Sequence, residues 1–383
     1  MKLYEYEARD IFQNYNIPME KAIYVENIDQ LIENIDKINP PYVLKAQVLV
    51  ASRGKLGGIK FASTKKEAID KARGLFKRRI RGLKVKGLLL AERVSIDREL
   101  YLGYVIDRAT RKIILISSPE GGVDIEELAK KDPTKVMSIP VNPIIGVKDY
   151  IIRRTIKHLR IKKELAGSLK SIIYKMYQIM LDYHCELIEI NPLVISNNKI
   201  LAIDRKMIID DSAVKIYKHL NKYLEERKKE MSKEELEAFL HGFSYVGLDG
   251  DIAIVGNGAG LTMATMDAIM EFGGKPACFL DIGGGATSER VSKAIKLLLN
   301  KQGIKAIAMN ILGGITRCDE VAKGIIDAIK EGPYKPIIIR LSGTEEDKGR
   351  EILSQSKIIV ASSLDDLAQK AVYMVKSSGH PNR

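Results

Sequence analysis

The sequence predicts an α/β protein built from two large domains, the second of which contains a parallel, doubly wound sheet. The chain has 383 residues, which exceeds the about 100–200 residues of an ordinary domain. Its front part mixes helical and strand patterns, whereas its back part alternates short apolar strands with helical stretches. We expect domains at residues 1–240 and 241–383, with the boundary near His241–Tyr245.

The composition favours a globular, cytoplasmic protein. Apolar residues make up 45% of the chain and charged residues 29%, which is normal for a chain with packed cores. No apolar run approaches the roughly 18 residues of a membrane helix, and the start MKLYEYEARD lacks the apolar centre of a secretion signal. Cys185, Cys278 and Cys318 are far apart and odd in number, so we expect reduced thiols packed in the core.

The net charge of +13 raises the question of nucleic-acid binding. Part of this charge lies in residues 65–86, where Ala68, Ala72 and Leu75 recur at helical spacing. That pattern indicates an amphipathic helix with a solvated basic face. Because the chain has no nucleic-acid recognition motif and no tryptophan, we predict neither a nucleic-acid partner nor a membrane partner.

Periodicity and turn residues place the elements of the front domain in order. The expected helices cover residues 4–15, 28–38 and 165–184, and the expected strands cover residues 21–25, 42–46, 87–91, 100–107 and 112–117. Two further strands, at 185–195 and 200–208, form a hairpin-like pair. A long charged helix over residues 213–239 has the composition of a linker.

The back domain has five expected strands, at residues 252–255, 277–280, 306–311, 336–341 and 358–360. Glycine loops follow four of them, at residues 256–260, 283–285, 313–314 and 343. Ligands of such sheets bind outside the carboxyl ends of the strands, so these loops share one functional rim. Backbone N–H groups at the start of a helix attract anions, which predicts a phosphate or carboxylate there.

A nicotinamide dinucleotide is the main alternative ligand for this rim. Gly256-x-Gly258 follows a strand, and Asp281 lies near the end of the next strand, where a ribose-binding acid is expected. However, Gly260 comes one position early for the dinucleotide motif, and another glycine loop follows Asp281 directly. The spacing therefore disfavours a dinucleotide.

The front domain offers groups for a polyphosphate and a metal. Lys45 and the loop Arg53-Gly54-Lys55 supply cations and backbone donors directly after a strand. Asn191 and Asp204 lie on neighbouring expected strands, so their oxygens could reach one magnesium ion, although each alone would be an ordinary turn or surface residue. The five histidines, which we expect to be structural or exposed, are His158, His184, His219, His241 and His380.

Eight stretches in collinear order make the chain similar to the beta subunits of succinyl-CoA synthetase (succinate–CoA ligase). They are LYEYEARDIF, RGKLGGIK, ELYLGYVIDR, EGGVDIEELA, LIEINPLVI, GNGAGLTMATMD, FLDIGGGATSERV and NILGGITRCD. The resemblance implies an ATP-grasp fold for about the first 240 residues and a flavodoxin-like ligase domain for the rest. It also implies formation of succinyl-CoA from succinate, CoA and ATP or GTP, with Mg2+ and with an alpha subunit that carries a phosphohistidine and the CoA site.

The same resemblance implies roles for individual residues and an alpha-beta heterodimer or heterotetramer. Nucleotide contacts are implied for Lys45, Ser52, Arg53, Gly54 and Glu99, and magnesium contacts for Asn191 and Asp204. Glu189 matches an acid that steadies the phosphohistidine. The substrate and phosphate rim matches Asn257, Gly314, Ile315 and Thr316.

Three positions depart from the family pattern. The loop before Arg53 reads Leu49-Val50-Ala51-Ser52, where the family is usually glycine-rich. The glutamate of the adenine hinge aligns with Ala91, with Glu92 one place later, so the base preference stays open. Arg205 stands where glycine is common. The alternatives are a ligase for malate or another dicarboxylate, and a non-catalytic nucleotide-binding regulatory subunit.

Overall fold

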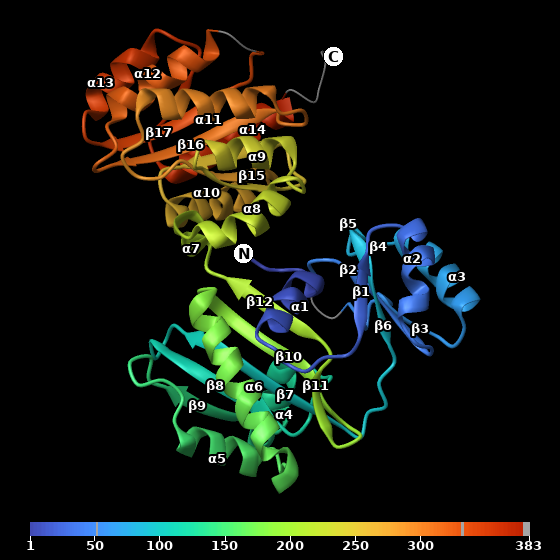
Figure 1. Cartoon of the computed structure of the whole chain (residues 1–383). Helices are drawn as coiled ribbons and strands as arrows, with labels where there is room; N and C mark the ends of the chain where they lie inside the picture. Colours follow the sequence, from blue (N-terminus) through green and yellow to red (C-terminus); the bar gives the residue numbers. More distant parts are fainter. Residues whose placement is uncertain (51–52, 331–332, 378–383) are drawn as a thin grey trace. The chain divides into compact units, whose positions relative to one another are not determined.

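The computed structural model describes residues 1–50, 53–330 and 333–377 (Figure 1). The chain divides into two compact units, Met1–Leu224 and Glu225–Arg383. Both units mix helices and strands, and the second contains a mainly parallel sheet, as the sequence predicted. None of the helices in the described ranges combines the length and apolar character that crossing a membrane requires.

Two main antiparallel sheets, one smaller and one larger, and a short two-stranded sheet of β4 (Arg79–Ile80) and β5 (Leu83–Lys84) lie in the described part of the first unit. The smaller sheet has the order β1-β6-β2-β3 and comprises Ala22–Val25, Gly87–Glu92, Tyr42–Gln47 and Ile59–Ala62. Helices α2 (Ile28–Asn34) and α3 (Lys65–Phe76) pack against it. Helix α3 buries Ala68, Ala72 and Leu75, which confirms the amphipathic helix predicted for the basic run.

The larger sheet of the first unit has the order β11-β10-β7-β8-β9, with β12 also paired to β10. Its strands are β7 (Arg98–Asp107), β8 (Lys112–Ser118), β9 (Met137–Val141), β10 (Cys185–Ser196), β11 (Lys199–Ala202) and β12 (Arg205–Ile209). The remaining helices of the unit are α1 (Glu5–Asn14), α4 (Ile125–Lys131), α5 (Asp149–His158), α6 (Lys163–Asp182) and α7 (Asp211–Ile216). Short helical elements are η1 (Ile35–Lys37), η2 (Pro133–Lys135) and η3 (Lys218–Leu220).

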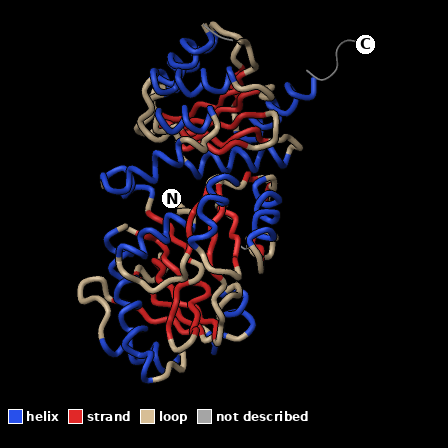
Figure 2. Tube along the Cα trace, turned by 45° about the vertical axis from the view of Figure 1, so that its right-hand side comes forward, coloured by secondary structure: helices blue, strands red, loops and turns tan. Residues whose placement is uncertain are grey.

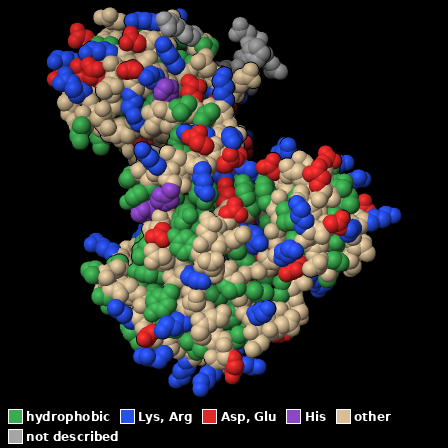
Figure 3. All heavy atoms as spheres, in the orientation of Figure 1, with side chains coloured by type: hydrophobic (Ala, Val, Ile, Leu, Met, Phe, Trp, Pro, Cys, Tyr) green, Lys and Arg blue, Asp and Glu red, His purple; other side chains and the backbone are tan. Residues whose placement is uncertain are grey.

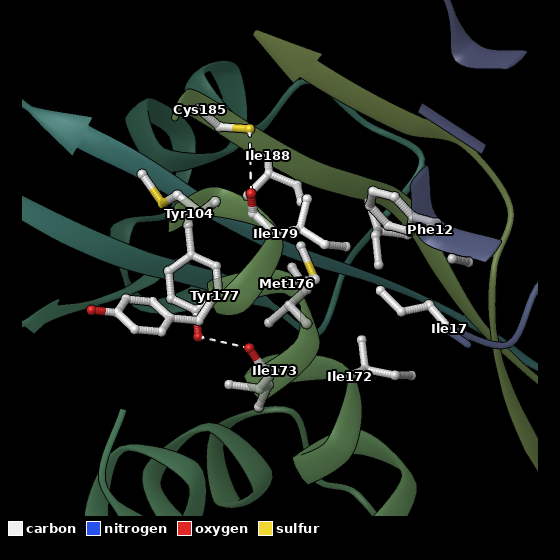
Figure 4. Packing of buried hydrophobic residues seen from close by; sticks show 14 of the residues in the cluster. Phe12, Ile17, Tyr104, Ile172, Ile173, Met176, Tyr177, Ile179, Cys185 and Ile188 are labelled. Carbon is white, nitrogen blue, oxygen red and sulfur yellow. Dashed lines mark hydrogen bonds between the residues drawn. The ribbon is translucent and has the colours of Figure 1, made fainter. Parts of the chain in front are cut away.

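Helix α6 forms the centre of the core beside this larger sheet. Its apolar residues recur at helical spacing, and Ile172, Ile173 and Met176 are fully buried among sheet residues and Phe12 of α1 (Figure 4). The buried Tyr104 hydroxyl donates a hydrogen bond to the Ile173 carbonyl at 3.1 Å, so its polar group is satisfied. The core therefore fixes α1 and the sheet together.

A local irregularity in β10 shapes the edge of the sheet where predicted site residues lie. The register between β10 and β7 shifts between Ile190 and Leu193, because Pro192 has no N–H group for the ladder. The Asn191 N–H instead donates to the Asp204 carbonyl at 2.9 Å. This bond brings the backbone of the two predicted metal ligands together.

The second unit contains a six-stranded sheet of order β13-β15-β14-β16-β17-β18. The five predicted strands are present and parallel, as Ile252–Gly256 (β14), Pro276–Asp281 (β15), Ala306–Gly313 (β16), Ile337–Gly343 (β17) and Ile359–Ala361 (β18). The edge strand β13 (Ser244–Gly247) runs antiparallel to β15 and was not predicted.

Helices cover both faces of this parallel sheet, which Figure 2 shows as strands enclosed by helices. Helices α10 (Ala259–Glu271) and α14 (Leu364–Ser377) pack on the face that includes Ile252 and Ile254. Helices α11 (Ser288–Asn300), α12 (Cys318–Ile329) and α13 (Glu346–Ser354) pack on the opposite face, which includes Ala253 and Val255. The alternation follows from the two-residue period of a strand.

The predicted linker helix over residues 213–239 is wrong. After α7, the chain forms η3, α8 (Asn221–Lys228) and α9 (Lys233–Leu240) as separate elements. Ser232 begins α9 with a capping box, in which its hydroxyl accepts from the Glu235 N–H while the Glu235 carboxylate accepts from the Ser232 N–H. This local cap competes with continuation of one helix, which the charge pattern alone did not reveal.

Two predictions from composition concern side-chain environments. Cys185, Cys278 and Cys318 are buried and form no disulfide, which confirms their assignment as reduced core residues. On the face drawn in Figure 3, Lys and Arg side chains and Asp and Glu side chains both occur on each unit. This mixture is typical of a solvated charged surface.

Candidate functional site

A cluster of six charged side chains occupies the interior of the first unit. Its members are Glu5, Glu20, Lys45, Arg53, Asp204 and Arg205. The cluster contains three acids and three bases, so its formal charges balance. Balance is required because an unpaired ion in such a setting would cost several kcal/mol.

Lys45 lies on β2 and is almost fully buried. Its ammonium donates to Glu5 Oε1 at 2.9 Å, to Glu20 Oε1 at 3.2 Å and to the Ile203 carbonyl at 2.6 Å. A lysine ammonium has three N–H donors, and these three acceptors match them. A phosphate that binds Lys45 must therefore share or replace one of the protein acceptors.

Arg53 connects the turn after β2 to the proposed metal ligand Asp204. Its guanidinium pairs with the Glu5 carboxylate and donates to Asp204 Oδ1 at 3.0 Å. The turn closes through hydrogen bonds from Gly57 N to Gly54 O at 3.0 Å and from Gly58 N to Arg53 O at 2.8 Å. Gly54 is exposed in this turn. Ser52, also predicted to contact nucleotide, lies outside the described residues.

The cluster keeps its buried acids ionised. Burial alone would raise the pKa of Glu5, but Arg53, Lys45 and Arg205 together lower this pKa well below its ordinary value. Burial also raises the pKa of Glu20, but the charges of Arg205 and Lys45 outweigh burial, so this pKa is lowered as well.

For Asp204, burial dominates and raises the pKa, and Arg53 offsets only part of that effect. The Asp204 side chain is nevertheless 35% exposed, so water reaches it and relieves some of the penalty. A second cation beside Asp204 would therefore stabilise the ionised form of this accessible carboxylate.

The loop after β8 brings Asn191 next to Glu99. Asn191 Oδ1 accepts a hydrogen bond from Gly122 N at 2.7 Å, and its amide nitrogen donates to the Val123 carbonyl at 2.9 Å. Gly122 has φ +70°, and a Cβ placed there would lie 2.4 Å from Glu99 Oε2. The Glu99 carboxylate could move away from such a Cβ, but the positive φ favours glycine at this position.

Asn191 and Asp204 fit a magnesium ion whose remaining ligands are phosphates and water. Their backbones are hydrogen-bonded to each other, and both side chains carry the hard oxygen atoms that this ion prefers. Within the ranges that the structure describes, no three His, Cys, Asp or Glu residues gather into a metal cage. The donors suit a metal that arrives with a polyphosphate.

Glu189 lies on β10, two residues before Asn191. It accepts a hydrogen bond from the Tyr101 hydroxyl at 2.9 Å and pairs with Lys206 at 3.3 Å. Burial and the Glu189 charge raise the pKa of Tyr101, so the phenol stays protonated and can donate. Glu92 ends β6, where its backbone N–H donates to the Lys21 carbonyl at 3.0 Å.

In the second unit, a hydrogen-bond clasp joins three loops of the rim. The buried Thr316 hydroxyl accepts from Gly285 N at 2.9 Å and from Asn257 Nδ2 at 3.1 Å. The Asn257 amide also donates to the Leu312 carbonyl at 2.9 Å and accepts from Leu312 N at 3.0 Å. Thr316 and Asn257 thus fix the loops, and their side chains are turned toward protein groups.

Gly314 and Ile315 form the accessible part of the same rim. The Ile315 side chain is 89% exposed, and a Cβ on Gly314 would meet nothing within 4 Å. Helix α10 begins beside the rim at Gly258, whose φ of +152° favours glycine. Asp281 accepts from Gly283 N at 2.8 Å, so it closes its own loop, unlike a ribose-binding acid.

Comparisons with known proteins agree with this organisation. The ATP-grasp domain family matches residues 2–195, and the CoA-ligase family matches residues 255–374. Succinate–CoA ligase [ADP-forming] subunit beta of Staphylothermus marinus is 49% identical over 379 residues, covering 98% of this chain and 99% of that protein. The chain belongs to the succinate–CoA ligase beta-subunit family. The protein of the same name from Methanocaldococcus jannaschii is 44% identical over 374 residues, covering 97% and 99% of the two chains.

A solved structure shares the fold of this beta-subunit family member. ATP citrate lyase from Methanothrix soehngenii, in complex with citrate and coenzyme A, superposes with a TM-score of 0.74. The match covers 97% of this chain and 99% of that one at 18% identity, so it concerns the fold alone. The family resemblance that the sequence motifs indicated is confirmed. The ATP-grasp domain comes first along the chain, and the CoA-ligase domain follows it.

The histidines of this beta-subunit family member make contacts typical of structural residues. His158 Nε2 lies 3.2 Å from the Lys135 carbonyl, and His219 Nε2 lies 3.1 Å from the Asp182 carbonyl. The His184 and Tyr217 rings stack with 3.9 Å between their centroids, and the His241 ring centroid lies 5.9 Å from that of Phe243. His380 lies outside the described residues.

Sequence reasoning missed the partners that hold the predicted residues in place. Glu5 falls within the quoted motif LYEYEARDIF, and it is a charged residue buried on α1. An acid on the inward face of an amphipathic helix signals a buried ion pair. Thr316 was predicted as a substrate residue. Nothing in the sequence indicated that its hydroxyl is buried.

Replacing Thr316 by valine should destabilise the second unit by about 1–3 kcal/mol, because the N–H groups of Gly285 and Asn257 lose their acceptor. Urea unfolding of the full chain measures this change. Thr316→Ser keeps the hydroxyl and is the matched control, so it should lose much less stability. If Thr316→Val unfolds at the same urea concentration as the unmodified chain, the clasp does not stabilise the second unit.

Proposed function

We propose that this chain is the nucleotide-binding subunit of a succinate–CoA ligase. With an alpha subunit it converts succinate, CoA and ATP to succinyl-CoA, ADP and phosphate. The observation that carries the proposal is the gathering of Lys45, Arg53, Asn191 and Asp204 in the ATP-grasp unit of a member of this family. The names of the relatives support ATP over GTP, the choice that the sequence left open.

The polyphosphate of ATP binds beside β2 and the turn that follows it. Lys45 and Arg53 supply positive charge, and the exposed Gly54 supplies a backbone donor, a role that the family resemblance also implies for Ser52. Glu99, held against the backbone of Gly122, is a further nucleotide contact, and Glu92 at the end of β6 serves the base. These groups bind and orient the phosphates and do no covalent chemistry.

Asn191 and Asp204 hold the magnesium ion that accompanies the nucleotide. When bound, the ion neutralises charge on the phosphate oxygens. The role of the protein is to fix the two oxygen ligands, through the backbone bond between these residues and the contact of Asn191 with Gly122. Both ligands of the site are present, which disfavours a non-catalytic regulatory subunit.

The alpha subunit supplies the phosphohistidine and the CoA site, in an alpha-beta heterodimer or heterotetramer. The histidine contacts with carbonyl groups and with Tyr217 support a carrier on the partner. Glu189, fixed by Tyr101 and Lys206, accepts the N–H of that histidine and steadies it.

The rim of the second unit binds the carboxylate of succinate. The exposed backbone of Gly314 and Ile315 offers N–H donors, and the start of α10 stabilises the phosphoryl charge. Asn257 and Thr316 act by holding these loops in place. The same rim governs the choice between succinate and malate or another dicarboxylate, and the names of the relatives support succinate.

The purified chain alone should bind nucleotide and show no ligase turnover, because the carrier histidine and the CoA site belong to the partner. Incubation with γ-labelled ATP followed by acid treatment tests for a phosphoprotein. Adding the alpha subunit should produce both the label and succinyl-CoA. Robust succinyl-CoA synthesis by the isolated chain would refute the division of labour.

Asp204→Ala should abolish magnesium-dependent nucleotide use, since the cation loses its charged ligand. Asn191→Ala removes a neutral ligand and should act less severely, with at least about a tenfold rise in the magnesium concentration needed for half-maximal activity. Titration of the assembled enzyme with Mg2+ measures both effects. Normal activity of both variants at limiting magnesium would contradict the metal assignment.

Gly314→Val should cut succinyl-CoA formation about a hundredfold while ATP still phosphorylates the partner. Gly314 has no positive φ, and a Cβ there would meet nothing within 4 Å. The variant should therefore fold normally, and its side chain should block the close approach of the substrate. Partner phosphorylation and succinyl-CoA formation are measured separately. Equal loss of both, or of neither, would move the substrate site away from this loop.

A further inference from the structure

Arg205 forms the most extensive hydrogen-bond set of the buried cluster. Its Nη1 and Nη2 atoms donate to the two carboxylate oxygens of Glu20 at 2.8 and 2.9 Å, which is a bidentate pair. Nη1 also donates to the Ala202 carbonyl at 2.6 Å, and Nη2 to Glu5 Oε1 at 3.0 Å. The side chain is fully buried, so these contacts fix its position.

Arg205 and Lys45 share the same acceptors. Glu20 Oε1 receives Arg205 at 2.9 Å and Lys45 at 3.2 Å, and Glu5 Oε1 receives both cations at 3.0 and 2.9 Å. A planar guanidinium binds a carboxylate through two hydrogen bonds, whereas an ammonium is a single point charge. Arg205 therefore neutralises most of the Glu20 charge that would otherwise act on Lys45.

We propose that Arg205 and Glu20 are positioning residues that set how tightly the protein holds Lys45, and hence how readily its ammonium meets a polyphosphate. The inference rests on the proposed nucleotide site. Without Arg205, the carboxylates of Glu20 and Glu5 would act more strongly on Lys45 and Arg53, with which they pair. Attraction between buried charges is strong, so these carboxylates would hold the ammonium more tightly and a phosphate would replace them less readily.

The position of Arg205 in the chain suits this role. It begins β12 and lies opposite Ile190 of β10, directly after Asp204. The Asp204 side chain pairs with Arg53, while the Arg205 side chain pairs with Glu20. The proposed metal ligand Asp204 thus lies directly before Arg205 at the start of β12. Arg205 in turn competes with the proposed phosphate ligand Lys45 for the same carboxylates.

Nucleotide affinity of the full chain tests the proposal. Isothermal titration with Mg2+ and ADP should give a Kd at least tenfold higher for Arg205→Met than for the unmodified chain. Adding Glu20→Gln to the same chain should restore the Kd to within about threefold, because the carboxylate that captures Lys45 is neutral. Arg205→Lys supplies charge without the planar fork and should fall between these values.

Two controls separate positioning from loss of charge or of folding. Arg108→Met removes the same charge from an exposed pair with Glu186 and should leave the Kd unchanged. Thermal unfolding of every variant reports stability independently. A merely structural role would lower the unfolding temperature of Arg205→Met with no change in Kd, which would overturn the proposal.

The remaining outcomes are also decisive. A double variant as weak as Arg205→Met would show that Glu20 does not mediate the effect. If Arg205→Met does not fold, Glu20→Gln alone should bind nucleotide as well as the unmodified chain or more tightly, and a tenfold weaker Kd would overturn the inference. An unmodified chain that binds no nucleotide would overturn the proposed function and the inference with it.

Discussion

The carboxylate of Glu5 connects the parts of the first unit on which the proposed nucleotide site depends. It lies on α1 near the start of the chain and pairs with Lys45, Arg53 and Arg205, which come from β2, from the turn after β2 and from β12. Arg205 is 200 residues away in sequence. Buried ions tolerate little rearrangement, because each loss of a partner leaves an uncompensated charge. The cluster therefore constrains the smaller sheet, α1 and the end of the larger sheet to one another.

This constraint accounts for the geometry of the site. Arg53 reaches Asp204 from the turn after β2, and Asp204 in turn bonds the backbone of Asn191. Asn191 holds the loop at Gly122, against which Glu99 lies. A chain of short contacts thus joins the groups proposed for phosphates and metal. In the second unit, the clasp of Thr316 and Asn257 performs the comparable task for the rim loops.

Local patterns in the sequence predicted the strands of the second unit and the family of the chain. The five parallel strands of the second unit were recognised because buried strands are short apolar runs separated by helices. The family was recognised from collinear motifs, and the comparisons confirm it. The break in the linker was missed, because the cap at Ser232 acts locally against a helical charge pattern. The site assignments themselves stay proposals.

Side-chain partners were beyond the reach of sequence reasoning. The pairing of Arg205 with Glu20 joins residues 185 apart, and no local period reports such a contact. The same limit applies to Thr316, whose hydroxyl is buried between loops. These features depend on tertiary packing, which brings distant residues into one place.

We propose that the cations held by Glu5 and the oxygens of Asn191 and Asp204 belong to one magnesium–nucleotide site. A crystal structure of the chain with Mg2+ and ADP tests it most directly. The account predicts Mg2+ within about 2.0–2.1 Å of Asp204 and Asn191 oxygens, with phosphate oxygens hydrogen-bonded to Lys45 and Arg53. A bound nucleotide whose phosphates and metal lie elsewhere, while Lys45 and Arg53 keep only their present protein partners, would contradict it.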